Sequence, residues 1–201
     1  MGLFDTLLGR TKPVRANLDA LFALPSAAVT LETAAGLSPT GRAAVCWKPP
    51  AGQEAEDVQH EIADLLGLPA DASGAPPATA GRLAEAQDAY GYRWLLLEDP
   101  DIESLVTNLH LVNTTLAENG WGPQLLCSVV ALAPGPGAPA DTGPCFLVYL
   151  YKRGTFYPFA PDGPEHRDNE LELRVRATVG SDLPIEPDLS RWFPMWDMPL
   201  R

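Results

Sequence analysis

The sequence lacks the motifs that mark common catalytic centres. It contains no HExxH metalloprotease motif, no GxSxG nucleophile turn and no GxxxxGK[ST] phosphate loop. Cysteine is scarce, and Cys46, Cys127 and Cys145 show no CxxC spacing. All three lie in apolar stretches, which predicts reduced core residues rather than disulfides or metal ligands. The sequence therefore favours a non-enzymatic protein without a cofactor.

Long hydrophobic runs are also missing. No apolar stretch reaches the roughly 18 residues that a membrane-spanning helix needs. The chain also does not begin with the apolar segment and cleavage site of a secretory signal peptide. We therefore expect a cytoplasmic protein, whose contact with a membrane would be peripheral and at its inner face.

Basic residues are few relative to acidic ones. The 201 residues include 14 Lys and Arg against 26 Asp and Glu, a formal net charge of −12. Residues 54–118 hold 13 of the acids and only two bases, Arg82 and Arg93. This balance argues against a nucleic-acid partner, because phosphate binding needs a basic surface. Anionic lipid would be repelled by the body of the chain, so membrane contact would be local to the basic N-terminus.

The N-terminal end of the chain is apolar, which is unusual for a terminus. Residues 1–12 predict a short amphipathic helix with its apolar side chains on one side and a basic end. The candidate partner- or membrane-binding residues are Leu3, Phe4, Leu7, Leu8, Arg10 and Lys12. Docking of this segment on the protein's own core is the alternative that the sequence leaves open.

Hydrophobic periodicity and turn residues predict the remaining elements. We expect helices at 17–24, ended by Pro25, at 54–66, and from an N-cap at Asp99 to Asn119-Gly120. Strands are expected at 27–32, 42–48, 90–98, 124–133, 145–152, 155–159 and 170–178. Residues 36–41 read as a turn, and residues 69–81 and 133–144 read as long connections. The aromatic tail at 191–198 is expected to fold back onto the body.

This order predicts an α+β fold, mainly antiparallel sheet packed against two or three helices and preceded by the short amphipathic helix. The chain length suits a single domain, residues 1–201. Within it, residues 17–98 and 99–201 form two possible packed halves behind the helical tail at 1–12. Whether the halves share one sheet is not decided by the sequence.

One polar cluster offers an alternative to a purely binding function. Asp99, Glu103 and His110 fall along one edge of a predicted helix, and carboxylates with a histidine can bind a divalent metal or move protons. Capping of the helix accounts for the same acids, since negative charge stabilises a helix N-terminus. We therefore assign no metal site, and keep these three residues as candidates for a metal-dependent enzyme or regulator.

A set of aromatic residues offers a second alternative, a peptide-holding chaperone with a groove on its sheet. The set comprises Tyr149, Tyr151, Phe156, Tyr157 and Phe159, in two adjoining strands. Aromatic residues in such positions more often form cross-strand pairs in the core.

Four stretches carry a resemblance to a known family. They are Met1–Pro13 (MGLFDTLLGRTKP), Asn17–Leu31 (NLDALFALPSAAVTL), Asp99–Asn113 (DPDIESLVTNLHLVN) and Tyr149–Pro161 (YLYKRGTFYPFAP). Over essentially its whole length, to about Trp192–Trp196, the chain is similar to the actinobacterial PspA-associated protein PspAB family. The resemblance implies an accessory or adaptor protein of the phage-shock envelope-stress system that acts by protein–protein interaction near the membrane. It implies a PspA-like protein or an HtpX-type membrane protease as partner, and it carries over no catalytic residues.

Overall fold

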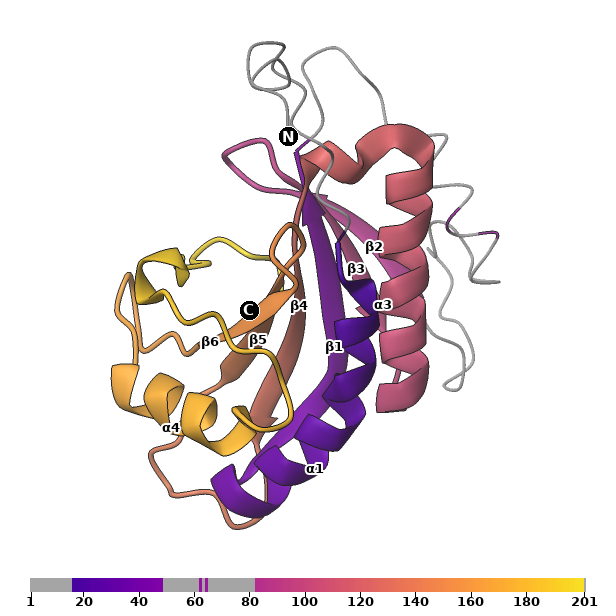
Figure 1. Cartoon of the computed structure of the whole chain (residues 1–201). Helices are drawn as coiled ribbons and strands as arrows, with labels where there is room; N and C mark the ends of the chain where they lie inside the picture. The colour runs from indigo at the N-terminus through magenta and orange to yellow at the C-terminus, as the bar shows by residue number, and fades with distance from the viewer. Residues whose placement is uncertain (1–15, 49–61, 63, 65–81, 201) are drawn as a thin grey trace, which may run out of the picture.

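The computed structural model describes residues 16–48, 62, 64 and 82–200, which form a sheet with helices on one face (Figure 1). The helices are a 3-10 helix (Leu18–Ala23) that leads into α1 (Leu24–Ala35), α3 (Ile102–Leu116) and α4 (Asn169–Val179). The strands are β1 (Leu37–Trp47), β2 (Arg82–Gln87), β3 (Arg93–Glu98), β4 (Leu125–Pro134), β5 (Cys145–Leu150) and β6 (Thr155–Phe159). The expected α+β class, with an antiparallel sheet packed on helices, is confirmed.

The six strands form one sheet in the order β2-β3-β1-β4-β5-β6, and every neighbouring pair is antiparallel. β1 lies at the centre, where it pairs with β3 on one side and with β4 on the other. The strands before residue 99 and those after it therefore share one sheet. Of the expected strands, those at 42–48, 90–98, 124–133, 145–152 and 155–159 are present, while β2 was not foreseen.

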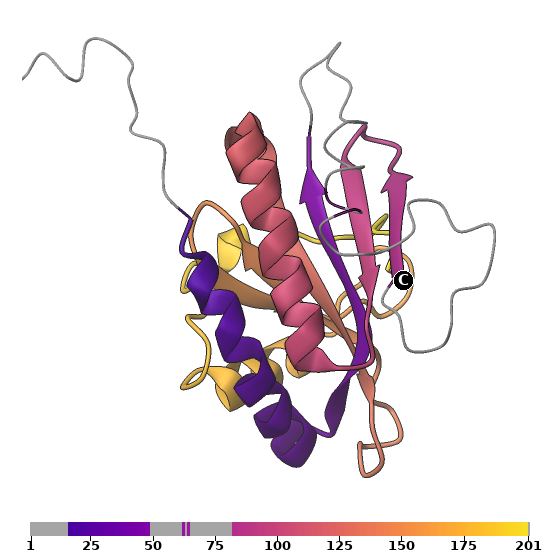
Figure 2. The same ribbon diagram turned by 90° about the vertical axis from the view of Figure 1, so that its right-hand side faces the viewer.

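The main core lies between the sheet and the three helices, which Figure 2 shows on one side of the strands. Residues from α1, α3 and α4 pack there on alternate residues of the strands, such as Ala43, Val45 and Trp47 of β1. The intervening residues Ala44 and Cys46 face the opposite side of the sheet, where they form a second cluster with the C-terminal segment. The expected folding back of the aromatic tail is thus confirmed.

The prediction for the first helix was wrong at its end. Pro25 was expected to stop the helix, and residues 27–32 were expected to form a strand. In the structure Pro25 occupies the first turn of α1, where its missing N–H costs nothing, and the helix runs on to Ala35. Gly36, with φ of 66°, ends it in the left-handed conformation.

The helical segment Leu18–Ala35 also corrects the expectation about hydrophobic runs. By length and composition, with a mean hydropathy of 1.2, it would pass as a membrane span. The core helix of a soluble protein meets the same criterion. Leu21, Leu24 and Leu31 are buried in the core, so one face of this segment packs against the sheet.

Residues 36–41 were expected to form a turn, but Gly36 ends α1 and residues 37–41 belong to the start of β1. The pairing of β1 with β4 shifts register between Pro39 and Ala43, so this part of the strand is irregular. Gly41 lies at the irregularity with φ of 75°, and a Cβ there would come within 2.8 Å of the Asp99 carbonyl oxygen. The close approach of the two backbones requires glycine at this position.

The strand expected at 170–178 is helix α4. Asp168 accepts a hydrogen bond from the Leu171 amide at 2.8 Å and so caps the helix. Leu171, Val175 and Val179, four residues apart, are its buried face. The alternation that suggested a strand includes Leu173, which is 49% exposed.

Helix α3 was expected, but its N-cap is Asp101 rather than Asp99. The Asp101 side chain accepts a hydrogen bond from the Ser104 amide at 2.7 Å, while Asp99 accepts one from the Asp101 amide at 3.0 Å. The helix ends at Leu116, and Gly120 follows with φ of 88°. The expected N-terminal helix at 1–12 and the connection at 69–81 lie outside the described residues, as does all of the helix at 54–66 except Ile62 and Asp64.

Candidate functional site

A cavity of about 710 Å³ opens on the face of the sheet opposite the helices. We call it the aromatic cavity, because most of its large side chains are aromatic. Its lining residues are Cys46, Lys48, Asp88, Tyr90, Tyr92, Trp94, Leu126, Cys127, Leu150, Tyr157 and Phe193 to Met198. They come from five strands or their ends and from the C-terminal segment, so only the folded chain assembles them.

The floor of the aromatic cavity consists of strand residues on the side of the sheet opposite α1, α3 and α4. Cys46 of β1 lies directly opposite Trp94 of β3 and, on its other side, opposite Cys127 of β4. Tyr157 of β6 belongs to the same buried cluster. All four residues are at most 5% exposed, which makes the floor rigid and apolar.

One wall is the turn between β2 and β3, and Asp88 organises it. One carboxylate oxygen of Asp88 accepts hydrogen bonds from the amides of Tyr90 and Tyr92, at 2.9 and 3.0 Å. The other oxygen accepts the indole N–H of Trp94 at 3.1 Å. Gly91, with φ of 78°, provides the left-handed residue of the turn. The turn thus presents the Tyr90 side chain, 67% exposed, at the rim.

Lys48 is the basic residue among those that line the aromatic cavity. Its ammonium group lies 4.6 Å from the centre of the Tyr92 ring and donates a hydrogen bond to the Tyr90 carbonyl oxygen at 3.2 Å. An ammonium group has three N–H donors. Lys48 can therefore stay on the aromatic wall and still bind an acceptor on a ligand.

The opposite wall is the C-terminal segment, which Trp192 anchors. Its ring stacks on Tyr157, with centres 6.0 Å apart, and its indole N–H donates to the Glu186 carbonyl oxygen at 3.1 Å. Its own carbonyl oxygen accepts a hydrogen bond from Arg167. The Tyr157 hydroxyl donates to the Phe193 carbonyl oxygen at 2.9 Å. These contacts fix the direction in which residues 193–198 leave the anchor and cover the sheet.

Two buried carboxylates support this anchor. Glu172, 2% exposed, accepts hydrogen bonds from Arg167 and from the Ala160 amide. Glu186 is fully buried and accepts hydrogen bonds from Arg153 and Thr155. Burial raises the pKa of Glu186, but the hydrogen bonds from Arg153 and Thr155 outweigh burial and leave it below its ordinary value. Both carboxylates are therefore structural, because their oxygens are occupied within the protein.

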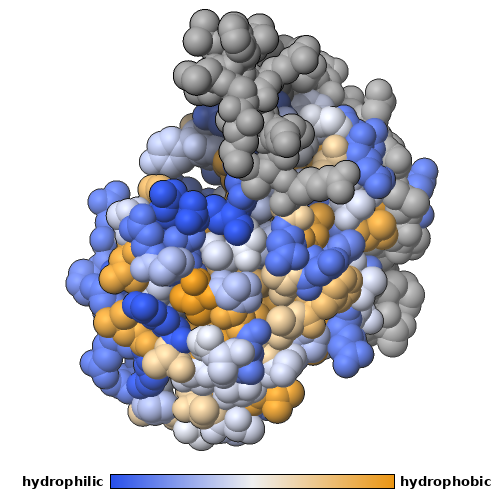
Figure 3. Space-filling view, viewed as in Figure 1, coloured by the Kyte–Doolittle hydropathy of each residue, from blue (hydrophilic) through white to orange (hydrophobic). Residues whose placement is uncertain are grey.

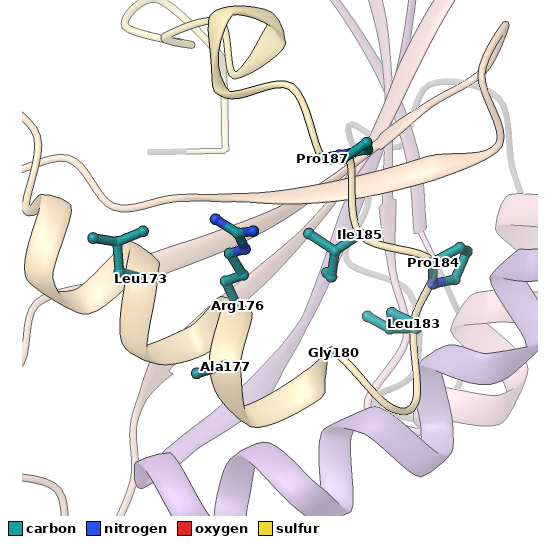
Figure 4. Close-up of a pocket in the computed structure, with 8 residues that line it drawn as sticks. All are labelled: Leu173, Arg176, Ala177, Gly180, Leu183, Pro184, Ile185 and Pro187. Atoms are coloured by element: carbon teal, nitrogen blue, oxygen red, sulfur yellow. The ribbon is translucent and has the colours of Figure 1, made fainter.

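A second, shallower groove of about 600 Å³ lies between α4 and the segment that follows it (Figure 4). Leu173, Arg176 and Ala177 of α4 line one side. The other side is lined by Leu183, Pro184, Ile185 and Pro187. On the face seen in Figure 3, hydrophobic residues reach the surface in separate patches among hydrophilic ones. The groove has fewer aromatic and polar groups than the aromatic cavity, which is the better-formed candidate site.

The structure separates the three candidate metal residues. His110 points toward the 3-10 helix, where its Nε2 lies 4.0 Å from Asp19 and its ring packs 4.9 Å from Phe22. Glu103 lies in the first turn of α3 and Asp99 precedes the helix, whereas His110 lies near its middle. Within the described part of the chain, no three His, Cys, Asp or Glu residues lie close enough to hold a metal ion. Leu3, Phe4, Leu7, Leu8, Arg10 and Lys12 lie outside the described residues.

The aromatic set considered for a peptide groove divides between the two faces. Tyr149, Tyr151 and Phe156 lie in the core on the helix side, whereas Tyr157 lines the aromatic cavity. The residues that sequence reasoning missed are Tyr90, Tyr92 and Trp94. Their spacing of two along the chain places them on one side of an extended segment, a signal that the sequence does contain.

Comparisons with known proteins agree with the resemblance in the sequence. A family model described as "PspA associated protein B" matches residues 1–200. No curated protein and no solved structure gives a significant match.

Proposed function

The chain belongs to the PspA associated protein B family, and from this premise we propose that it is a non-enzymatic adaptor that binds a PspA-like protein. The contact surface that we propose is the aromatic cavity. The family description names an association with PspA and no reaction. An adaptor needs a binding surface, and the aromatic cavity is the observation that carries the proposal.

The composition of the aromatic cavity suits a segment of another protein. Tyrosine, tryptophan and methionine are enriched at protein interfaces. The aromatic rings offer large apolar area with few flexible bonds, and methionine adapts its shape to a partner. Burying one apolar side chain of a partner there would contribute on the order of 2 kcal/mol. Lys48 would donate a hydrogen bond to a carbonyl or carboxylate oxygen of the same segment. We infer a partner segment with an aromatic or aliphatic anchor next to an acidic residue.

The N-terminal residues supply the second part of the proposal. We propose that Leu3, Phe4, Leu7 and Leu8, followed by Arg10 and Lys12, contact the partner or the inner face of the membrane. Four buried apolar side chains give about 1.5–3 kcal/mol each. Ordering ten residues costs on the order of 1–2 kcal/mol per residue. The segment is therefore expected to act together with a partner on the membrane rather than alone.

Two exposed residues of the C-terminal segment allow a matched test of the cavity. Phe193 lines it and is 59% exposed, while Leu189 is 53% exposed and lies outside the lining. We expect Phe193→Ser to weaken binding to a PspA-like protein of the same organism by about tenfold or more. Leu189→Ser should leave the affinity unchanged. Calorimetry or surface plasmon resonance with purified proteins measures both.

Equal affinities of the wild type and Phe193→Ser would rule out the aromatic cavity as the contact surface. Binding of an HtpX-type membrane protease instead of the PspA-like protein would assign the other partner class. If unrelated unfolded proteins compete equally for the cavity, the chain is a peptide-holding chaperone.

The N-terminal part is tested by co-sedimentation with anionic liposomes. The full-length protein and a variant without residues 1–12 are compared, each with and without the PspA-like protein. We expect binding only when the partner is present, and loss of binding in the truncated protein. Binding of the full-length protein to lipid alone would indicate a direct membrane anchor. Equal sedimentation of both proteins would remove these residues from the binding function.

A further inference from the structure

Cys46 and Cys127 are a closely placed pair of thiols in the floor of the aromatic cavity. They lie directly opposite each other in the antiparallel pairing of β1 and β4. Directly opposite residues in such a pair have Cα atoms about 4.5–5.5 Å apart, within the range of about 4.4–6.8 Å that a disulfide spans. Both thiols are free.

Both thiols also face a space that small molecules can enter. Cys46 and Cys127 are only 2% and 5% exposed, yet both line the aromatic cavity. The third cysteine, Cys145, lies in the core between the sheet and the helices and is fully buried. A solute in the cavity would therefore meet two of the three cysteines.

We propose that Cys46 and Cys127 form a reversible disulfide across β1 and β4, generated by a small peroxide that enters the aromatic cavity. In the first step the Cys127 thiol, the more exposed of the two, reduces hydrogen peroxide and becomes a sulfenic acid, with release of one water. In the second step the sulfur of Cys46 attacks the sulfenic sulfur, and a second water leaves with the Cys46 proton. The two sulfurs together lose two electrons and two protons, and the peroxide is reduced to two waters.

The surroundings of Cys46 fit the role of the second thiol. A hydrogen bond with Cys127, burial and the negative charge of Asp88 together raise the pKa of the Cys46 thiol. Because thiolate is the form that reacts with peroxide, the raised pKa disfavours Cys46 as the first thiol to be oxidised. The same raised pKa slows its attack on the sulfenic sulfur, for which Cys46 must lose its proton. The antiparallel pairing of β1 and β4 holds Cys46 opposite Cys127, where it meets the sulfenic acid once that forms. Oxidation is expected to be slower than for an exposed cysteine.

The test treats the folded full-length protein with hydrogen peroxide and then blocks remaining thiols with an alkylating agent. Before alkylation, we expect peroxide treatment to lower the mass of the chain by that of two hydrogen atoms. After alkylation, digestion should give two peptides joined by a disulfide between Cys46 and Cys127. Dithiothreitol should restore both thiols. Cys145 should be alkylated only after unfolding, both before and after peroxide treatment.

Variants provide the matched controls. Cys145→Ser should form the disulfide as the wild type does, while Cys46→Ser and Cys127→Ser should not. A second probe, phenylarsine oxide, bridges two neighbouring thiols and should add once to the wild type and to Cys145→Ser. It needs no oxidation, so it tests proximity separately from reactivity. The inference is overturned if Cys46 and Cys127 stay alkylatable after peroxide treatment of the folded protein, or if Cys145 enters the disulfide.

Discussion

Arg167 and Glu172 form a bidentate ion pair. Nε of the arginine donates to Oε1 of the glutamate and Nη2 donates to Oε2, both at 2.8 Å. The pair does more than fill the space beside α4. The remaining nitrogen of Arg167 donates a hydrogen bond to the Trp192 carbonyl oxygen. It therefore connects the start of α4 with the segment that forms one wall of the aromatic cavity.

Removing Arg167 should destabilise the protein strongly. In Arg167→Leu the carboxylate of Glu172, whose side chain is only 3% exposed, would stay buried without its partner. We expect a loss of about 3 kcal/mol in the free energy of unfolding, measured by urea denaturation. The double variant Arg167→Leu/Glu172→Leu should recover part of this loss. If the single variant is as stable as the wild type, the pair does not hold this region.

Trp192 should control whether the C-terminal segment stays on the sheet. Trp192→Ala removes a side chain that is 6% exposed, together with its stacking on Tyr157. A loss of about 3 kcal/mol is expected for such a truncation. Hydrogen exchange should rise in residues 186–200 and stay unchanged in α3. Trp192→Phe keeps a ring and should give a smaller effect, and equal exchange in all three proteins would contradict the assigned anchor.

The contribution of ionised Glu186 to stability should depend on pH. Its pKa in the folded protein is below the ordinary value, so its contribution is complete above the pKa of the unfolded chain, about 4.3 for Glu. The contribution is lost as the pH falls through the lower, folded pKa. Glu186→Gln should therefore be less stable than the wild type at neutral pH, and the difference should shrink below about pH 4. Urea denaturation from pH 7 to pH 3 measures it, and a constant difference would contradict the interpretation.

The side chain that stabilises the start of α3 should be Asp101 rather than Asp99. Asp101 accepts the Ser104 amide, and this hydrogen bond lowers the pKa of its carboxyl group. Asp101→Ala leaves that amide without its cap and should lower the melting temperature more than Asp99→Ala does. The opposite order would restore Asp99 as the N-cap.

Metal ions should give no stabilisation that depends on His110. The imidazole packs on Phe22 and lies beside Asp19, away from Asp99 and Glu103. Thermal unfolding with Mg²⁺, Mn²⁺ or Zn²⁺ should therefore respond alike in the wild type and in His110→Ala. A shift that His110→Ala abolishes would support the metal-dependent alternative.

The sequence predicts the α+β class and most strands, because β4, β5 and β6 consist of apolar or alternating residues between clear turns. It also determined the inner face of α3, whose residues Leu105, Leu109 and Val112 repeat at helical spacing. These features depend on residues that are close together in the sequence, so the spacing of apolar residues over three or four positions is enough to predict them.

Tertiary structure decided the rest. Residues 170–178 alternate as a strand does, yet they form α4, because Asp168 caps the helix and Arg167 compensates the buried charge of Glu172. Pro25 lies inside a helix because the preceding 3-10 turn places it in the first turn. The aromatic cavity joins β1, β3, β4, β5 and β6 with residues 193–198. Strand order and the docking of the tail depend on contacts between distant residues, and no local pattern specifies them.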